Sequence, residues 1–531
     1  MLKRTTMQEL NKKILIWAAS LIAGFTLCGG IINLVAKQQL RAALADMPGA
    51  QITIGKVHLS LLAGNVELED VAFALRDTAG AGPDIEANIK SLKLQHIRWF
   101  RLLKGEAGAR RLLIREPVAK VLLKTPQKEE PDTTEAQESF LKKLSLAELK
   151  VEDGQVSLCS QADSTRASAQ KINVSVRGIA LDLQEENYAF NDSLYSMALD
   201  SLDFRDAPGL TRYQIAHLAT ADAGPIEALG IHLYNCVPQE AVAERMGKVA
   251  AVWFDVKLDT LSTSAVNLPR MVRDKRIAID DVSVAAKEVT IFQDDRYPPA
   301  VPYASTQEGI NAVPLPLQIS HVGASLKTFT FIWETTHVNH GALSMQQIAV
   351  SVNSVSNTPD NVMDMTMKAE TAGQGHVALS LSTRNDKRET THGEIHASHL
   401  DPSKLDSFMR PLFGATAQGN FHRIDSRFTG DKNHMKSNFC MVYDNLAVKA
   451  WNDVNAPIKF IAKNSGMVTF LANLALPKAN PAMPGKEPKQ VETHYDRNPM
   501  QPYAVYLAQC LTTGIMYTML PGAKVHAKNK K

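Results

Sequence analysis

The stretch VHLSLLAGNVELEDVAF, residues 57–73, decides the fold of this chain. Apolar and polar residues alternate on both sides of Gly64-Asn65, which is a turn signal. An apolar residue at every second position is typical of a β-strand with one face toward a core and one toward water. The apolar positions are Val57, Leu59, Leu61, Val66, Leu68, Val71 and Phe73. The stretch therefore predicts a β-hairpin with one apolar face.

The same alternation extends outward, back to Ile52 and forward through most of the chain to Val448. Residues 144–158, 276–291 and 315–331 each repeat an alternating strand, a short polar turn and a second strand. Their irregular spacing excludes a strict solenoid repeat. One-residue shifts of the alternation predict bulges or bends, which suit a strongly curved sheet.

Polar interruptions of the alternation are expected to be turns. Asp280-Asp281 and Asp294-Asp295 are assigned to turns because Asp bonds well to the local backbone. The alternation in residues 112–123 is interrupted at Pro117, which predicts a strand pair around it. We therefore expect a mainly β fold, largely antiparallel and curved, with few helices.

Two helices are expected in the second half of the chain. Asp401 and Pro402 are suited to the N-cap and first position of a helix that Gly414 ends. Residues 503–519 carry apolar side chains at helical spacing, which predicts a C-terminal amphipathic helix. The Lys-rich tail after it suits an anionic lipid or an acidic protein patch, and equally a solvated end.

The amino terminus differs from the rest of the chain. Residues 14–36 contain no charged residue, and a helix of that length spans about 34 Å, enough to cross a membrane. The basic residues of segment 1–13 favour a cytoplasmic amino terminus. A cleaved signal peptide would need a shorter apolar run and a small residue where Leu34 stands, and a lipoprotein site at Cys28 would need a small residue before it. We expect an uncleaved single-pass anchor with the remainder exported.

Composition excludes several functional classes. The 531 residues carry 58 Lys+Arg against 55 Asp+Glu, and this net charge of +3 is too small for bulk binding of nucleic acid. The five cysteines form no Cys-x-x-Cys pair and indicate neither a disulfide framework nor a thiolate metal site. None of the common catalytic signatures occurs, so we expect a protein that is not an enzyme and needs no cofactor.

The stretch HGEIHASH, residues 392–399, is the densest cluster of metal-ligand residue types. On a strand, His392, Glu394 and His396 project from one face and could approach one metal ion. The alternative is a polar strand face in water, with Ile395 and Ala397 on the other side. We favour this alternative and predict no metal site, which leaves an envelope hydrolase or metal protein as a third hypothesis.

The patterned stretches resemble a known family. Residues 57–73, IRWFRLLKG at 97–105 and REP at 115–117 are similar to the amino-terminal region of the AsmA-like proteins of Gram-negative bacteria. These are related to TamB and more distantly to bridge-like lipid-transfer proteins. The resemblance returns in residues 144–158, 399–413, 419–430 and 441–448, so with the anchor it covers about half the chain.

The resemblance implies one inner-membrane helix and a periplasmic, elongated, trough-like β-sheet whose apolar face carries acyl chains or supports outer-membrane biogenesis. The implied segments are 1–13 cytoplasmic, 14–36 transmembrane, 37–123 amino-terminal β region, 124–140 linker, 141–476 β-rich body, 477–498 Pro-rich linker and 499–531 helix with tail. Physical reasoning agrees, because an apolar sheet face with few helices must meet itself, a partner or lipid.

The expected function is therefore lipid transport or envelope biogenesis, with phospholipid or another acyl lipid as partner. The candidate lining residues of the groove are Leu59, Leu61, Val66, Leu68, Phe73, Leu146, Leu149, Val350 and Val352. A closed sandwich with these residues in its core is the structural alternative. The functional alternative is an anchored scaffold that binds no lipid and recruits envelope-assembly proteins through sheet edges or the terminal helix.

Overall fold

The computed structural model describes residues 50–60, 63–75, 84–98, 106–122, 143–160, 165–182, 187–189, 195–206, 209–222, 224–246, 253–334, 340–371, 375–451, 476–481, 483 and 485–519. The fold is mainly β, with 69% strand and 11% helix, which confirms the expected class. The chain divides into two compact units, unit 1 (residues 1–229 and 265–273) and unit 2 (residues 230–264 and 274–531). Each unit is described by itself.

Several expectations fall outside the described residues: segment 1–13, the membrane span 14–36, the linker 124–140 and the tail after residue 521. Among the residues that are described, no helix combines the length and the apolar character needed to cross a membrane.

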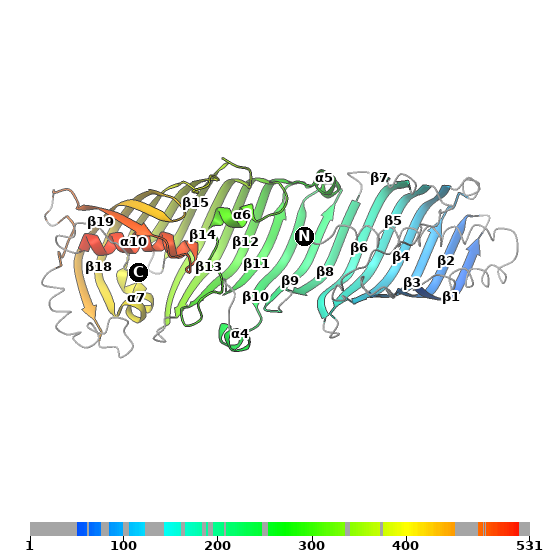
Figure 1. Ribbon diagram of the computed structural model, residues 1–531, viewed down its shortest axis with the longest axis horizontal. Helices are drawn as coiled ribbons and strands as arrows, with labels where there is room; N and C mark the ends of the chain where they lie inside the picture. The colour runs from blue at the N-terminus through cyan, green and yellow to red at the C-terminus, as the bar shows by residue number, and fades with distance from the viewer. Residues whose placement is uncertain are drawn as a thin grey trace, which may run out of the picture. The chain divides into compact units, whose positions relative to one another are not determined.

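Unit 1 is a sheet whose strands mostly pair with their neighbours in sequence. Pairing is antiparallel from β1 to β4 and from β5 through β6 and β8 to β9, whereas β4 and β5 are parallel. The strands are β1 (Ala50–Ser60), β2 (Asn65–Leu75), β3 (Asp84–Gln95), β4 (Glu106–Leu122), β5 (Lys143–Cys159), β6 (Thr165–Asp182), β7 (Asn187–Ala189), β8 (Tyr195–Arg205) and β9 (Thr211–Ala221) (Figure 1). β1 and β2 form the hairpin predicted from residues 57–73. β10 (Ile226–Asn235) and α5 (Leu268–Asp274) are divided between the two units.

Unit 2 continues in the same style, with one parallel pair, β12 and β13, in an otherwise antiparallel series from β11 to β20. Its strands are β11 (Trp253–Thr263), β12 (Ile277–Asp294), β13 (Leu317–Glu334), β14 (His340–Ser356), β15 (Val362–Thr371), β16 (His376–Arg384), β17 (Thr391–Leu400), β18 (Ala415–Gly430), β19 (His434–Ala450) and β20 (Gln490–Asp496). Its helices are α4 (Gln239–Met246), α6 (Thr306–Asn311), the 3₁₀ helix η1 (Pro402–Leu405), α7 (Asp406–Phe413) and α10 (Tyr503–Met519).

Both predicted helices are present. The Asp401 side chain accepts from the Ser403 backbone N–H at the start of η1, which leads into α7, and Gly414 ends α7 at a left-handed φ of 66°. α10 spans the predicted residues 503–519. The linker expected at 477–498 is partly wrong, because β20 lies within it and pairs with β19.

The predicted strand-turn-strand units are single long strands. β5, β12 and β13 each run through the positions assigned to turns, and so does β4 through Pro117. At Asp153 the interruption is a bulge, with φ 53° and a shift of register against β6. Asp280 and Asp281 likewise lie inside β12, so their assignment to a turn is wrong. The bulge at Asp153 adds a residue without ending the strand, which is why the sequence pattern breaks there while the ladder continues.

Five residues of unit 1 with left-handed φ values line up across the sheet. Asp70, Glu116, Asp153, Lys171 and Ser201 all have left-handed φ values between 46° and 53°. The register places each of them in line with the next across β2, β4, β5, β6 and β8. We call this line the crease. The register shifts near this line between β5 and β6 and between β6 and β8, where bulges bend the strands in agreement with the predicted curvature.

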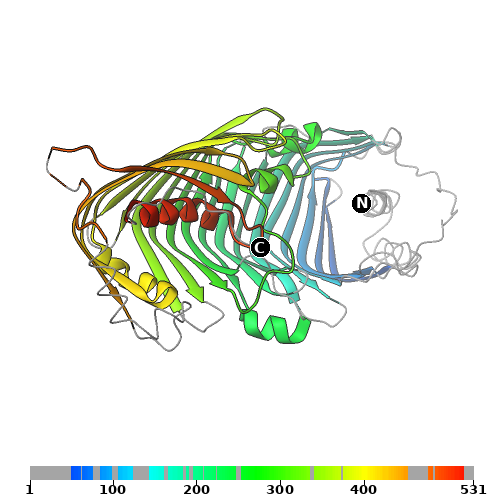
Figure 2. The ribbon, with the colours of Figure 1, turned by 60° about the vertical axis from the view of Figure 1, so that its left-hand side comes forward.

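The main described core of unit 2 lies between the sheet and α10. Figure 2 shows strands β12 to β19 arching around this helix. Met441 and Phe439 are 0% and 1% exposed, and Leu511 and Ile515 of α10 pack against their cluster. Tyr506 of α10 is buried in a second cluster with residues of β16 to β19. The face of the sheet that contacts α10 is therefore the concave, apolar face of unit 2.

Candidate functional site

Apolar residues of unit 1 line up in rows that cross the strands. Residues paired across neighbouring strands share one face of a sheet, so the register defines each row. One row consists of Leu59, Val66, Leu94, Leu112, Leu149 and Val176. A second consists of Val57, Leu68, Leu92, Ile114, Val151, Val174 and Met197. The sequence is alternating in every strand, and the register turns that alternation into a continuous apolar face.

The structure brings most of the candidate residues of unit 1 onto this face. Leu59, Val66 and Leu149 share the first row and Leu68 belongs to the second, with Val66 and Leu68 each 1% exposed. Phe73 is paired with Ile52 and Ala87, and Leu146 with Ala109 and Ile179. The Leu61 side chain lies outside the described residues.

The opposite face of unit 1 is charged and paired. Lys93 Nζ lies 3.0 Å from Glu67 Oε2, and this hydrogen bond lowers the pKa of Glu67. Arg115 Nε lies 3.1 Å from Glu152 Oε2, on a carboxylate whose pKa is lowered chiefly by its hydrogen bond with Lys150. The sheet therefore has one apolar face and one face of half-buried and exposed ion pairs.

Unit 2 has the same two-faced design, and it places Val350 and Val352 in adjacent rows. The Val350 row consists of Leu261, Val284, Ala324, Val350, Met367, Leu379 and Ile395. The Val352 row consists of Val282, Val322, Val352, Met365 and Leu381. Met365, Leu379, Leu381 and Ile395 belong to the cluster that packs with Tyr506 of α10. Val350 and Val352 are therefore on the concave face, in the part of their rows before α10.

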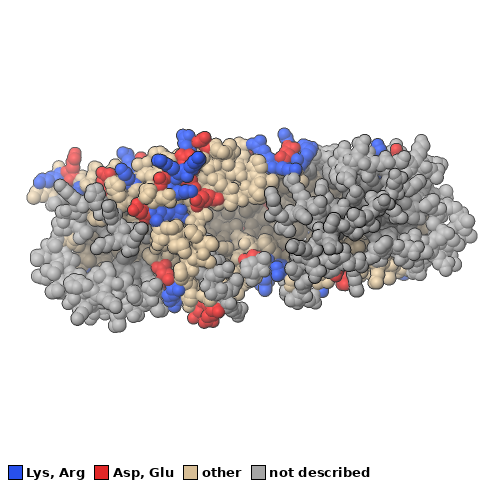
Figure 3. All heavy atoms as spheres, viewed as in Figure 1, with Lys and Arg blue, Asp and Glu red and all other residues tan. Residues whose placement is uncertain are grey.

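Coverage of this face changes along the rows. Under α10 the apolar side chains are sealed, with Ile395 and Phe428 at 7% and 4% exposure. Over β11 to β14, Val284, Val322 and Val352 are only half-buried. Among the described helices, α10 packs on β19 and β20 and α7 on β14 and β18, and none packs extensively on β11, β12 or β13. In the space-filling view the visible Lys, Arg, Asp and Glu side chains gather along the margins of a hollowed, uncharged surface (Figure 3).

The HGEIHASH residues do not converge. His396 Nδ1 lies 2.7 Å from Asp425 Oδ1, Glu394 pairs with Arg427 at 3.0 Å, and His392 Nδ1 lies 3.0 Å from Thr429 Oγ1. All three side chains are exposed, while Ile395 on the other face is buried. This confirms the polar strand face. In the part of the chain that the structure describes, no three His, Cys, Asp or Glu residues are placed to hold a metal ion.

Sequence reasoning missed the connection between the parallel strands β12 and β13. It begins with residues 296–304 (RYPPAVPYA), which we call the strap, and continues through α6. Arg296 pairs with Asp294 and Glu334 at the carboxyl ends of these two strands, and these partners raise the pKa of the guanidinium. Three prolines in nine residues favour an extended polyproline conformation. The prolines were visible in the sequence, but nothing there showed what the strap crosses.

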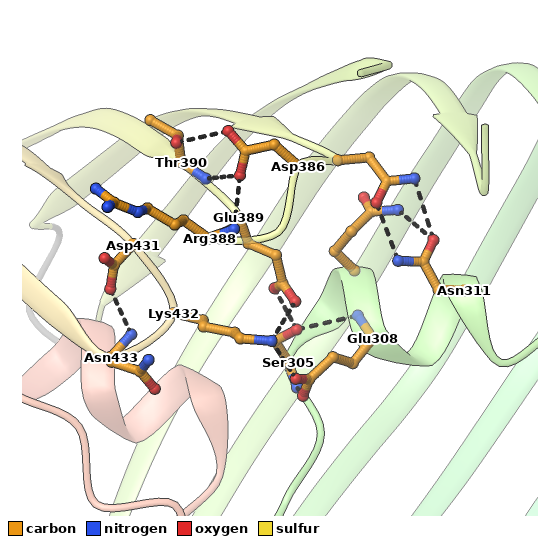
Figure 4. Close-up of polar contacts among 12 residues, drawn as sticks. Ser305, Glu308, Asn311, Asp386, Arg388, Glu389, Thr390, Asp431, Lys432 and Asn433 are labelled. Atoms are coloured by element: carbon orange, nitrogen blue, oxygen red, sulfur yellow. Dashed lines mark hydrogen bonds and ion pairs between the residues drawn. The ribbon is translucent and has the colours of Figure 1, made fainter. Parts of the chain in front are cut away.

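The far end of the strap is fixed by a polar cluster that we call the clasp: Ser305, Glu308, Glu389 and Lys432 (Figure 4). The Ser305 hydroxyl donates to Glu389, and the Glu308 backbone N–H donates to Ser305 Oγ at 3.0 Å, as the N-cap of α6. Lys432 Nζ donates to Glu308 Oε1 at 2.7 Å and to Glu389 Oε1 at 3.4 Å. The clasp therefore joins α6 to two turns of the sheet.

The clasp is electrostatically matched. The hydrogen bond with Lys432 lowers the pKa of Glu308, and the same bond raises the pKa of Lys432. The Glu389 side chain is 5% exposed, so its charge relies on Lys432 and Ser305 in place of water. Of this group, the sequence offered only the capping-box pattern Ser305-x-x-Glu308.

Comparison with protein-family models and with curated proteins found no match for this chain.

Proposed function

We propose that this is a lipid-handling protein of the cell envelope, with an AsmA-like architecture anchored in the inner membrane through residues 14–36. The observation that carries the proposal is the concave apolar face of unit 2, which α10 seals at one end and which is half-exposed over β11 to β14. The exported β-rich body would lie in the periplasm.

The dimensions of the open part suit an acyl chain. Neighbouring strands lie about 4.8 Å apart, so the three spacings from β11 to β14 amount to about 14 Å. One leaflet of a bilayer core is about 15 Å deep, half of the usual ~30 Å. An acyl chain lying along the rows would therefore contact apolar side chains over most of its length and leave its head group toward the charged margin.

A protein-recruiting scaffold remains the alternative, and the structure narrows it. The apolar face of α10 is occupied by the sheet, with Val505 and Tyr506 at 8% and 1% exposure. Such a scaffold would therefore use a sheet edge, such as β20, which pairs only with β19 among the described strands.

The test is native mass spectrometry of the full chain extracted in mild detergent. We expect co-purified lipid in the wild type, loss of it in Val352→Asp, and retention in the control Ser351→Asp, whose side chain is on the opposite face beside His321. Val352→Thr, which is nearly isosteric, gives a reduced lipid load even if the Asp variant fails to fold. A wild-type protein that carries no lipid refutes the proposal, and a protein partner in its place supports the scaffold.

A further inference from the structure

We propose that the strap is a gate over the open apolar face of unit 2, and that the clasp holds it closed. This inference rests on the proposed lipid-handling function. The strap, residues 296–304, would control how fast a lipid binds to the apolar face and dissociates from it. It would have little effect on the equilibrium affinity for the lipid.

Chain length requires the strap to take a short route across the sheet. From Asp294 to Ser305 there are eleven residue steps, which extend over at most about 39 Å. β12 alone has 18 residues and a contour length of about 56 Å. The strap starts at the carboxyl end of β12, and Ser305 contacts the turn after β16, at the other end of the strands. The strap can make this connection only if the strands are curved, so that their two ends are closer in space than their length. The strap then runs straight between the ends of the curved strands, as the chord of their arc.

Hydrogen bonds place the chord on the concave side. The Tyr303 N–H donates to Pro499 O at 2.9 Å, and Arg497 Nη2 donates to Tyr303 O at 2.5 Å. Pro499 leads directly into α10, whose Tyr503 and Tyr506 pack in the cluster on the concave face. The strap therefore passes on the same side of the sheet as α10, over the face that is otherwise half-open.

The strap is fixed at its ends and exposed between them. Arg296 holds one end, and at the other Ser305 is 3% exposed while Val301, in the middle, is 58% exposed. Prolines at 298, 299 and 302 have no N–H to donate, which limits the backbone bonds of this segment. A stiff segment held at its two ends can move as one piece when the attachments at one end loosen. The clasp is the charged attachment at the far end of the strap, beside the Tyr303 hydrogen bonds and those of Gln307 with Ser356 O and of Asn311 with Asn385, so its opening loosens this end.

The test measures exchange of a fluorescent fatty acid, anthroyloxy-stearate, with the full-length protein by stopped flow. Lys432→Met removes the cation of the clasp and keeps the side-chain length. Hydrogen bonds to charged groups contribute enough for an increase of about tenfold or more in both association and dissociation rates, with a Kd changed less than threefold. Lys257→Met is the control, because it removes an exposed pair with Glu288 on β11 and β12 and leaves the clasp intact. Glu389→Gln provides a second opening of the clasp with little change of volume.

The outcomes separate the two proposals. Equal acceleration of association and dissociation in Lys432→Met and Glu389→Gln, but not in Lys257→Met, supports the gate. If the probe binds and both rates stay within twofold of wild type, the gate is refuted and the lipid-handling function stands. If the wild type does not bind the probe, the proposed function fails first. Unchanged amide exchange in α10 shows that the variants keep the fold. A higher Kd for the probe without faster association and dissociation of the probe refutes the gate and assigns the clasp a structural role only.

Discussion

Gly514 provides the sharpest test of how α10 is seated, because two physical effects predict opposite signs for Gly514→Ala. Alanine is better than glycine in a helix interior by about 1 kcal/mol. A Cβ at position 514, however, would lie 2.5 Å from Cδ2 and 2.9 Å from Cβ of Phe439, against an ordinary carbon–carbon contact of about 3.5–4.0 Å. Phe439 is 1% exposed on β19 and has little room to move aside. Overpacking of this kind costs about 1–3 kcal/mol, so we expect the clash to outweigh the gain in propensity.

The assay is hydrogen exchange of the α10 amides in the full chain, which reports the free energy of local opening. We expect Gly514→Ala to lower this free energy by up to about 2 kcal/mol. The control Ala504→Gly, at an exposed position in the first turn of α10, shows the propensity effect alone, a loss of at most about 1 kcal/mol. Phe439→Ala should cost about 3–5 kcal/mol alone, and less in the Gly514→Ala background because the new methyl group partly fills the cavity. Greater protection of α10 in Gly514→Ala would show that the helix does not rest on Phe439, and the reasoning would be wrong.

Three further predictions concern the clasp, the crease and the histidine cluster. The folded-state pKa of Glu308 is lowered and that of Lys432 is raised. The clasp therefore contributes its full stability between the unfolded-state pKa values of these two groups, roughly 4.5 and 10.5. This stability is lost as the pH falls through the folded-state pKa of Glu308 or rises through that of Lys432. Exchange of the α6 amides, corrected for intrinsic rates, should therefore accelerate below pH ~4 in the wild type. The step should be smaller in Lys432→Met, where the Ser305 N–H and Arg497 still lower the pKa of Glu308. Asp153→Val should destabilise unit 1 by about 1–2 kcal/mol, because a β-branched residue is strained at a φ of 53°. The control Ser157→Val, in the same strand, should stay within about 0.5 kcal/mol of the wild type. Equal losses of stability for the two variants in denaturant titrations would show that backbone strain at Asp153 is not the cause. His392→Ala and His396→Ala should leave stability within about 0.5 kcal/mol, and zinc should be sub-stoichiometric in protein prepared without chelators; one zinc ion per chain would revive the metal hypothesis.

The sequence indicated which face of each strand is apolar, but not where each strand ends. Alternation in residues 57–73 correctly indicated which side of each strand is apolar, and Asp401 and Gly414 marked the ends of a helix through local chemistry. Interruptions such as Asp153-Gly154 were assigned to turns because a bulge and a turn use the same polar and glycine residues. Only the partner strand distinguishes them, since β6 continues beside β5 through the bulge.

The candidate site was predicted in the same partial way. Val350 and Val352 were chosen from alternation alone, and the register places both in rows that lead to α10. The clasp could not be found from sequence, because Glu389 and Lys432 are 43 residues apart and meet Ser305 only when three connections lie at one end of the strands. Charged residues in turns are common, and burial of Glu389 is what distinguishes this one.

The crease has a mechanical consequence. A sheet whose left-handed residues were scattered would resist bending about equally everywhere. In unit 1 five left-handed residues lie on one line across β2, β4, β5, β6 and β8, so these strands change direction together and the line is more compliant than the ladders beside it. We expect the two parts of the sheet to rotate about this line as a hinge. A small change of the angle between them would open or close the apolar face across several strands together.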